Sequence, residues 1–227
     1  MGAADSGRVA APVTRQMAWV VLWLLLAKLL GAGKEVLLAR AYGVGALMDG
    51  YQFTLQLASW PVSIFFAICS AALVPAYVAL RQQDATALHR LRAQVHGATL
   101  ALALLLSTAW LLLCLATPML GAWGGLSADA QAHARHLALP MTLLIGAGLY
   151  ASLLMAECIS GQHQASTLLE ATPAVVLGAL LLATAVPDAG TLLAGTLGGV
   201  LAQAAVLAGY TAVHMRLPVP SVRWHHA

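Results

Sequence analysis

The chain has 227 residues, of which 61% are hydrophobic and only 8% are charged, and its net charge is +3. A soluble domain carries about 25% charged residues, so this composition excludes a water-soluble globule and leaves a protein whose surface contacts lipid. The apolar runs are much longer than a strand and lack the alternation of a β-barrel. They favour helices, because a helix satisfies its backbone hydrogen bonds within one segment. We therefore predict an all-α integral membrane protein.

Windows of about 20 apolar residues, which suit a bilayer-spanning helix, predict one bundle of six transmembrane helices. In chain order, the predicted spans cover residues 17–42, 51–80, 97–115, 137–156, 171–186 and 189–213, with tails at 1–15 and 218–227. The second span contains no charge, and we expect Pro61 and Pro75 to bend it. The fifth span is the shortest. In the sixth, Gly195 and Gly199 form a GxxxG pattern that is typical of close helix packing.

Arginines in the predicted loops and tails indicate an orientation. Six spans place both tails, the 81–93 loop and the 157–170 loop on one side of the membrane. That side holds seven arginines, namely Arg8, Arg15, Arg81, Arg90, Arg92, Arg216 and Arg223. The opposite loops contain Arg135, with Arg40 close to that surface, and residues 121–136 there are expected to form a short interfacial helix. The positive-inside rule then predicts that both termini are cytoplasmic.

The first span is unusual because it contains Lys28, Lys34, Glu35 and Arg40. Each charge at bilayer depth costs at least about 2.5 kcal/mol, so these side chains are expected to face a protein interior or a wet cavity. Lys28 and Glu35 are seven residues apart and share one helix face. Three cations against one carboxylate leave a positive surplus, which predicts a cavity that binds an anion such as phosphate. In the alternative interpretation, Lys28 pairs with Glu35 while Lys34 and Arg40 reach toward the outer interface.

Other reactive side chains do not predict an enzyme. Cys69, Cys114 and Cys158 are isolated in apolar sequence without the spacing of a metal site. Glu157 and Glu170 border the 157–170 loop and are interpreted as solvated loop residues. The sequence also has no Gly-rich nucleotide motif. We expect no cofactor, no metal and no nucleic-acid partner.

One stretch of the sequence resembles a known family. Residues 28–49 are similar to the opening of the MurJ (MviN)-type lipid II flippases, in which a basic first helix is followed by a short turn and an Asp. The residues on this pattern are Lys28, Gly31, Lys34, Glu35, Ala39, Tyr42, Gly43 and Asp49. Further, weaker likeness lies at Leu73-Val74-Pro75, at Ala116-Thr117-Pro118 and at Leu139-Pro140.

This resemblance implies a fold and a function. The family belongs to the multidrug/oligosaccharidyl-lipid/polysaccharide exporter superfamily, whose members have two six-helix lobes around a central cavity and rock between inward-open and outward-open states. It implies that this chain is one lobe, which needs a second lobe as a homodimer or a separate subunit, in a bacterial inner membrane. The substrate would be an undecaprenyl-diphosphate glycan, such as lipid II or an exopolysaccharide precursor.

The resemblance also implies roles for single residues. Lys28 and Lys34 take the places of two cavity arginines, and Glu35 that of the acidic residue beside the second. Asp49 takes the place of the Asp that opens the second helix. Two other functions stay open: a non-transporting scaffold subunit of a polysaccharide assembly, which the charge-free second span favours, and a small-molecule exporter of the same superfamily. A surplus of lysine argues against export of cationic drugs.

Overall fold

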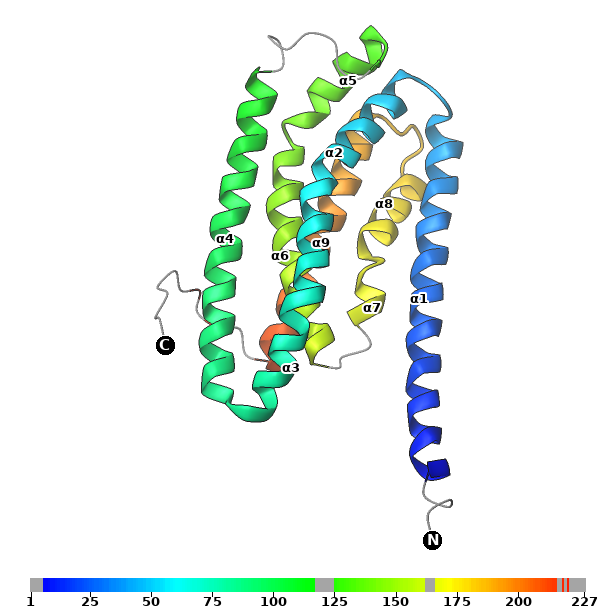
Figure 1. Ribbon diagram of the computed structural model, residues 1–227. Coiled ribbons are helices and arrows are strands. Elements are labelled where there is room, and N and C mark those ends of the chain that lie inside the picture. The colour runs from blue at the N-terminus through cyan, green and yellow to red at the C-terminus, as the bar shows by residue number, and fades with distance from the viewer. Residues whose placement is uncertain (1–5, 117–124, 162–165, 216–217, 219, 221–227) are drawn as a thin grey trace.

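The computed structural model describes residues 6–116, 125–161, 166–215, 218 and 220, and these residues form helices and no strand (Figure 1). The helices are α1 (Ser6–Tyr42), α2 (Ala46–Ile68), α3 (Val74–Gln83), α4 (Ala85–Ala116), α5 (Ala128–Ala138), α6 (Met141–Ser160), α7 (Ser166–Leu169), α8 (Thr172–Ala183) and α9 (Ala189–Met215), with a π-helical turn η1 (Cys69–Leu73) between α2 and α3. The predicted all-α fold is confirmed.

Four helices in the described part of the chain are long and apolar enough to cross a membrane. They are Ala46–Gln83, which joins α2, η1 and α3, and then Ala85–Ala116, Met141–Ser160 and Ala189–His214. They match the second, third, fourth and sixth predicted spans, and α1 covers the first. These helices are those of a membrane protein.

The fifth predicted span, 171–186, corresponds to α8, which is the shortest of the helices that match predicted spans. The helix is broken at Glu170 and Ala171 between α7 and α8, and α8 has 12 residues. At about 1.5 Å per residue, α8 alone is too short to cross a hydrocarbon core of about 30 Å. α8 begins at Thr172 with Pro173 in its first turn, where proline is favoured, so the predicted start at 171 agrees with the structure to within one residue.

The bundle is arranged around α6. This helix packs against α2, α4 and α9, and most of its residues are buried (Figure 1). α9 also packs against α8, whereas α1 lies at the edge of the bundle and contacts α7 and α8. α1 ends where Gly43 adopts a φ of 60°, the left-handed conformation that glycine tolerates. The Tyr42 hydroxyl donates a hydrogen bond to the Asp188 carbonyl over 2.9 Å, which ties this end of α1 to the loop before α9.

Glycines allow two helix pairs to approach closely. A Cβ atom on Gly199 would lie 2.7 Å from the Cα of Pro173, and one on Gly195 would collide with Leu177. α8 and α9 therefore pack backbone to backbone, as the GxxxG pattern predicted. A Cβ on Gly50 would lie 2.5 Å from the carbonyl oxygen of Ala130, so α5 packs equally closely on α2.

The two ends of the bundle hold the loops that the sequence assigned to them. α5, the short helix predicted near 121–136, begins after Ser127, whose side chain caps it by accepting from the Ala130 N–H over 3.2 Å. It lies at the same end as the turn between α1 and α2 (Figure 1). The start of α1, the turn from α3 to α4 and the end of α9 lie at the other end.

Pro75 follows an irregular turn in the second span. The Val74 N–H donates to the Cys69 carbonyl five residues earlier, which widens the helix into the η1 turn. Pro75 has no N–H to donate. The wider turn therefore lies where the hydrogen-bonding pattern of a regular α-helix is interrupted. Pro61, in contrast, lies inside α2.

Candidate functional site

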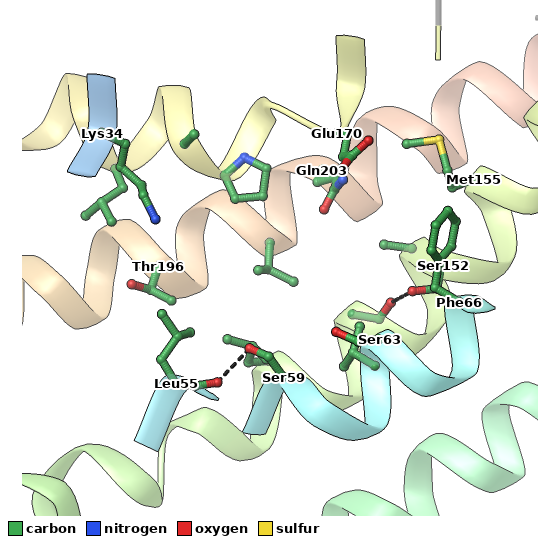
Figure 2. A pocket seen from close by; sticks show the side chains of 18 of the residues that line it. Lys34, Leu55, Ser59, Ser63, Phe66, Ser152, Met155, Glu170, Thr196 and Gln203 are labelled. Atoms are coloured by element: carbon green, nitrogen blue, oxygen red, sulfur yellow. Dashed lines mark hydrogen bonds between the residues drawn. The ribbon is translucent and has the colours of Figure 1, made fainter. Parts of the chain in front are cut away.

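A cavity of about 340 Å³ lies between α1, α2, α6, α8 and α9. Its polar lining consists of hydroxyl, amide and charged side chains, of which Figure 2 shows most: Lys34, Tyr51, Ser59, Ser63, Ser152, Glu170, Thr196 and Gln203. Apolar residues such as Leu55, Phe66 and Met155 line the rest. A cavity of this kind accommodates a ligand with polar groups next to apolar ones. Lys34 comes from α1, and Glu170 from the break before α8.

A second cavity of about 400 Å³ lies between α1 and the α7–α8 break. It is lined by Lys28, Lys34, Glu35 and Glu170. Lys34 and Glu170 line both cavities, so the two adjoin at these side chains. The second cavity lies at the edge of the bundle, where α1 rests on α7 and α8.

Three of the four charges of the first span, those of Lys28, Lys34 and Glu35, form ion pairs, though not as the sequence suggested. Lys34 Nζ lies 2.6 Å from Glu35 Oε1, and Lys28 Nζ lies 3.8 Å from Glu170 Oε1. The alternative pairing of Lys28 with Glu35 was therefore wrong. Glu170, interpreted from the sequence as a solvated loop residue, supplies the carboxylate that Lys28 contacts. Two lysines thus meet two carboxylates around the second cavity, which removes the predicted positive surplus there.

The remaining predicted site residues lie elsewhere. Arg40 and Asp49 are exposed and line neither of these two cavities. Asp49 lies in the first turn of α2, and Arg40 in the last turn of α1. The structure therefore brings Lys28, Lys34 and Glu35 together and leaves Arg40 and Asp49 outside.

A buried ionic cluster lies away from both cavities, between α4 and α6. Glu157 is fully buried in the last turn of α6, and Arg92 donates to both of its oxygens, with Nε to Oε1 and a terminal nitrogen to Oε2, each over 2.8 Å. The Nε2 atom of His96 lies 3.1 Å from the same Oε1. The interpretation of Glu157 as a solvated loop residue was wrong, because α6 continues through Glu157 to Ser160 and carries this side chain into the bundle.

The cluster extends beyond its charged members. His96 Nδ1 lies 3.1 Å from the Tyr150 hydroxyl, and the two rings meet edge to face. Arg81 donates to the Ser160 carbonyl over 2.8 Å and ties α3 to the end of α6. Tyr77 of α3 lies within electrostatic range of Glu157 and Arg92, and its buried hydroxyl has no hydrogen-bond partner among the described residues.

A spacing signal for this cluster was present in the sequence. Arg92 was assigned to the 81–93 loop, but α4 begins at Ala85, so Arg92 and His96 stand one turn apart on one helix face. Asp84 starts α4 by accepting hydrogen bonds from Thr86 and Ala87. The Thr86 hydroxyl, together with these backbone N–H groups, lowers the pKa of Asp84. An Asp-x-Thr start followed by Arg-x-x-x-His indicates a helix rather than a loop.

The two sites have different chemical capacities. The cavities offer two lysines, several hydroxyls and space for a ligand, whereas the cluster offers titratable groups that are buried and bonded to one another. Within the described residues, no group of three or more His, Cys, Asp or Glu side chains is placed to hold a metal ion. Comparisons with protein-family models, curated proteins and solved structures found no match.

Proposed function

We propose that the chain is one lobe of a transporter that moves an undecaprenyl-diphosphate-linked glycan across a bacterial inner membrane by alternating access. The observation that carries this proposal is the pair of adjoining cavities beside α1, with Lys34 at their junction. The cavity rich in hydroxyl groups suits a sugar. The cavity at the edge of the bundle suits a diphosphate whose lipid tail stays in the bilayer.

In this proposal, the lysines exchange partners when the substrate binds. Lys34 leaves Glu35, and Lys28 leaves Glu170, to contact phosphate oxygens, since lysine binds phosphate as a point charge. The empty site is then close to neutral, which lowers the cost of holding four charged side chains inside a membrane. No covalent step is required, because transport needs only a change in which side the cavity opens to.

The proposed partner is a second lobe, either another copy of this chain or a separate subunit. The side chains of Lys28, Glu35 and Glu170 are 71%, 56% and 53% exposed. In a lipid environment such charges require a protein or aqueous neighbour. Native mass measurement in mild detergent is expected to show a dimer or a hetero-complex, and a stable, active monomer would contradict this part of the proposal.

The proposed orientation places both termini in the cytoplasm. The turn that contains Asp84 and the helix that contains Asp129 lie at opposite ends of the bundle (Figure 1). Single cysteines at these two exposed positions, in a variant without native thiols, are expected to label from opposite sides, with position 84 labelled from the cytoplasm. Labelling of both positions from the periplasm contradicts the orientation.

Binding of undecaprenyl diphosphate tests the function directly. Purified protein in nanodiscs is expected to bind this probe more tightly than the neutral alcohol undecaprenol, because the alcohol offers the lysines no phosphate. Lys34→Ala is expected to weaken binding of the diphosphate at least about tenfold, the loss of about 1.4 kcal/mol. Lys34→Arg should keep most of the affinity, and Arg40→Ala is the matched control because Arg40 lines neither cavity.

The scaffold function is the second candidate, and the ion pairs favour it. If Lys34 serves only to neutralise Glu35, the double substitution Lys34→Met with Glu35→Leu should preserve complementation in a strain that lacks the protein. A phosphate site cannot be restored in this way, because the ligand needs the cation itself. Complementation by the double variant, or equal binding of diphosphate and alcohol, would defeat the transporter proposal.

A further inference from the structure

One outer face of α2 carries polar side chains, although the span to which it belongs contains no charged residue between positions 50 and 80. Exposed residues at spacings of three or four positions share this face, and we call them the α2 stripe: Gln52, Gln56, Trp60 and Ser63. The stripe extends over about 16 Å of the helix, at about 1.5 Å per residue. Its two glutamines are the feature that requires an explanation.

The stripe lies beside the other spanning helices. Tyr51, the residue before Gln52, shares a hydrogen bond of 2.8 Å with Thr196. Thr196 lies inside the spanning helix Ala189–His214, and Gln56 stands one turn further along α2 than Gln52. Both amides are thus placed within the bundle rather than in a loop. An amide that faces hydrocarbon has no partner for its hydrogen bonds, which is unfavourable.

The outer face of α4 has the opposite chemistry. α4 is also a spanning helix, and leucines are exposed on it, at 44% for Leu100, 71% for Leu104 and 64% for Leu105. Leucine side chains are as apolar as lipid tails, so this face suits direct contact with the bilayer. Because the α2 stripe offers glutamine where α4 offers leucine, we expect it to face protein rather than lipid.

The chemistry of the stripe also selects the kind of protein. Two copies of the chain in one membrane orientation are related by a two-fold axis along the membrane normal, so each residue beside the axis meets its own equivalent. Two equal charges in this position would repel each other. An amide carries both donors and an acceptor, so two equivalent glutamines can satisfy each other. The stripe is therefore self-complementary.

We infer that, resting on the second lobe of the proposed function, this lobe is another copy of the chain and binds along the α2 stripe. Gln52 and Gln56 hydrogen-bond the equivalent glutamines of the other copy, as Gln side chains do between membrane helices. Trp60, which is 58% exposed, supplies apolar contact area. Because Ser63 also lines the cavity of 340 Å³ (Figure 2), the contact follows the margin of each cavity. The two copies of this cavity then adjoin across the axis.

Disulfide formation between identical positions tests this contact. In the full chain without its native thiols, Gln52→Cys and Gln56→Cys are oxidised separately in membranes with copper phenanthroline. We expect a cross-linked homodimer for each, because a residue beside a two-fold axis lies close to its equivalent. Leu104→Cys is the matched control, since this position is exposed on α4 and should stay monomeric. Equal cross-linking at all three positions indicates random collision and overturns the inference.

Substitution of one amide tests the chemistry of the contact. Gln56→Leu removes the hydrogen bonds between the copies and should weaken the dimer about 3- to 30-fold, measured by energy transfer between labelled chains on dilution in detergent. Gln56→Glu should weaken it further, since two carboxylates then meet at the axis, whereas Gln56→Asn should keep most of the affinity. A dimer that is as stable in Gln56→Glu as in the unmodified chain contradicts the inference.

Other occupants of the stripe would give different products. If it lines a water-filled channel, Gln56→Cys reacts with a water-soluble thiol reagent and does not form the homodimer. If it binds a separate subunit, Gln56→Cys cross-links to a product whose mass is not twice that of the chain. Either result overturns the inference.

The proposed function fails by a different measurement. Binding of undecaprenyl diphosphate that does not depend on Lys34 defeats the transporter, while the cross-linked homodimer still supports the contact along α2. Conversely, binding that depends on Lys34 without a homodimer at Gln56 overturns the contact and leaves the transporter in place.

Discussion

α1 and α6 both carry charges within apolar sequence, but their surroundings are opposite. α1 lies at the edge of the bundle, and its Lys28 is 71% exposed and 3.8 Å from its carboxylate partner. α6 lies at the centre, and its one acidic residue, Glu157, is fully buried and held by two bonds from Arg92. The number of charges in a span therefore says less about structure than whether a second helix supplies a partner.

This difference has an energetic side. Exposed ion pairs contribute about 0–1 kcal/mol, because water competes for both ions. Removing one partner of a buried pair costs about 3–5 kcal/mol, because it leaves the other charge uncompensated. We therefore expect substitutions in α6 to change stability and substitutions of the α1 lysines to change ligand binding.

The largest effect is expected at Glu157. Glu157→Gln removes the carboxylate to which Arg92 donates two hydrogen bonds and should lower the free energy of unfolding by about 3–5 kcal/mol, measured as loss of the thermal transition in detergent. The double variant Arg92→Met with Glu157→Leu should recover much of this loss, since neither charge remains. If Glu157→Gln unfolds like the unmodified chain, the contrast between the two helices fails.

A smaller loss of stability is expected for a substitution between α9 and α8, the helix against which α1 packs. Gly199→Ala places a methyl group 2.7 Å from the Cα of Pro173. Such overpacking costs about 1–3 kcal/mol, and a lower midpoint of thermal unfolding should report it. Gly209→Ala in the same helix is the control, because nothing lies within 4 Å of its added carbon. Equal midpoints for the two variants would mean that α8 and α9 can separate at little cost.

A substitution at the end of α1 should reduce the stability less. Tyr42→Phe removes the 2.9 Å hydrogen bond to the Asp188 carbonyl, which is worth about 0.5–1.5 kcal/mol. Because this bond ties α1 to the loop before α9, faster amide hydrogen exchange is expected in the last turn of α1, with little change in α6. Slower or unchanged exchange there would show that packing on α8 holds this end by itself.

The smallest effect on stability is expected at Lys28. Lys28→Ala removes an exposed pair and should change the free energy of unfolding by less than about 1 kcal/mol. In contrast, the Lys28→Ala variant should bind undecaprenyl diphosphate more weakly than the unmodified chain, because Lys28 lines the second cavity. A large loss of stability with unchanged binding would reverse the roles that we assign to α1 and α6.

Much of the fold followed from the length and composition of the apolar runs. The all-α class and the packing role of Gly195 and Gly199 depend on local sequence, and the structure confirms both. The short helix α7 was not predicted, since it lies within the 157–170 segment that hydropathy assigned to a loop. The functional and orientation predictions stay predictions.

The buried cluster was missed for a different reason. Arg92 and Glu157 are 65 residues apart, and each is close to the end of its helix. When hydropathy is the only criterion, a charged residue near the end of a span is assigned to the adjoining loop. Only the packing of α4 on α6 shows that these two side chains meet. Likewise, the contact of Lys28 with Glu170 depends on the position of the α7–α8 break.

The close approach of α8 and α9 has a mechanical consequence. Gly195 and Gly199 pack directly on Leu177 and Pro173. The two helices are therefore expected to move as one rigid unit when the lateral pressure in the bilayer changes. The cavity beside it then has one rigid side and one compliant side. The second cavity, between α1 and the α7–α8 break, is therefore expected to widen or narrow by tilting of α1, which packs against α7 and α8. A change in lipid thickness that tilts α1 should therefore change the width of the second cavity.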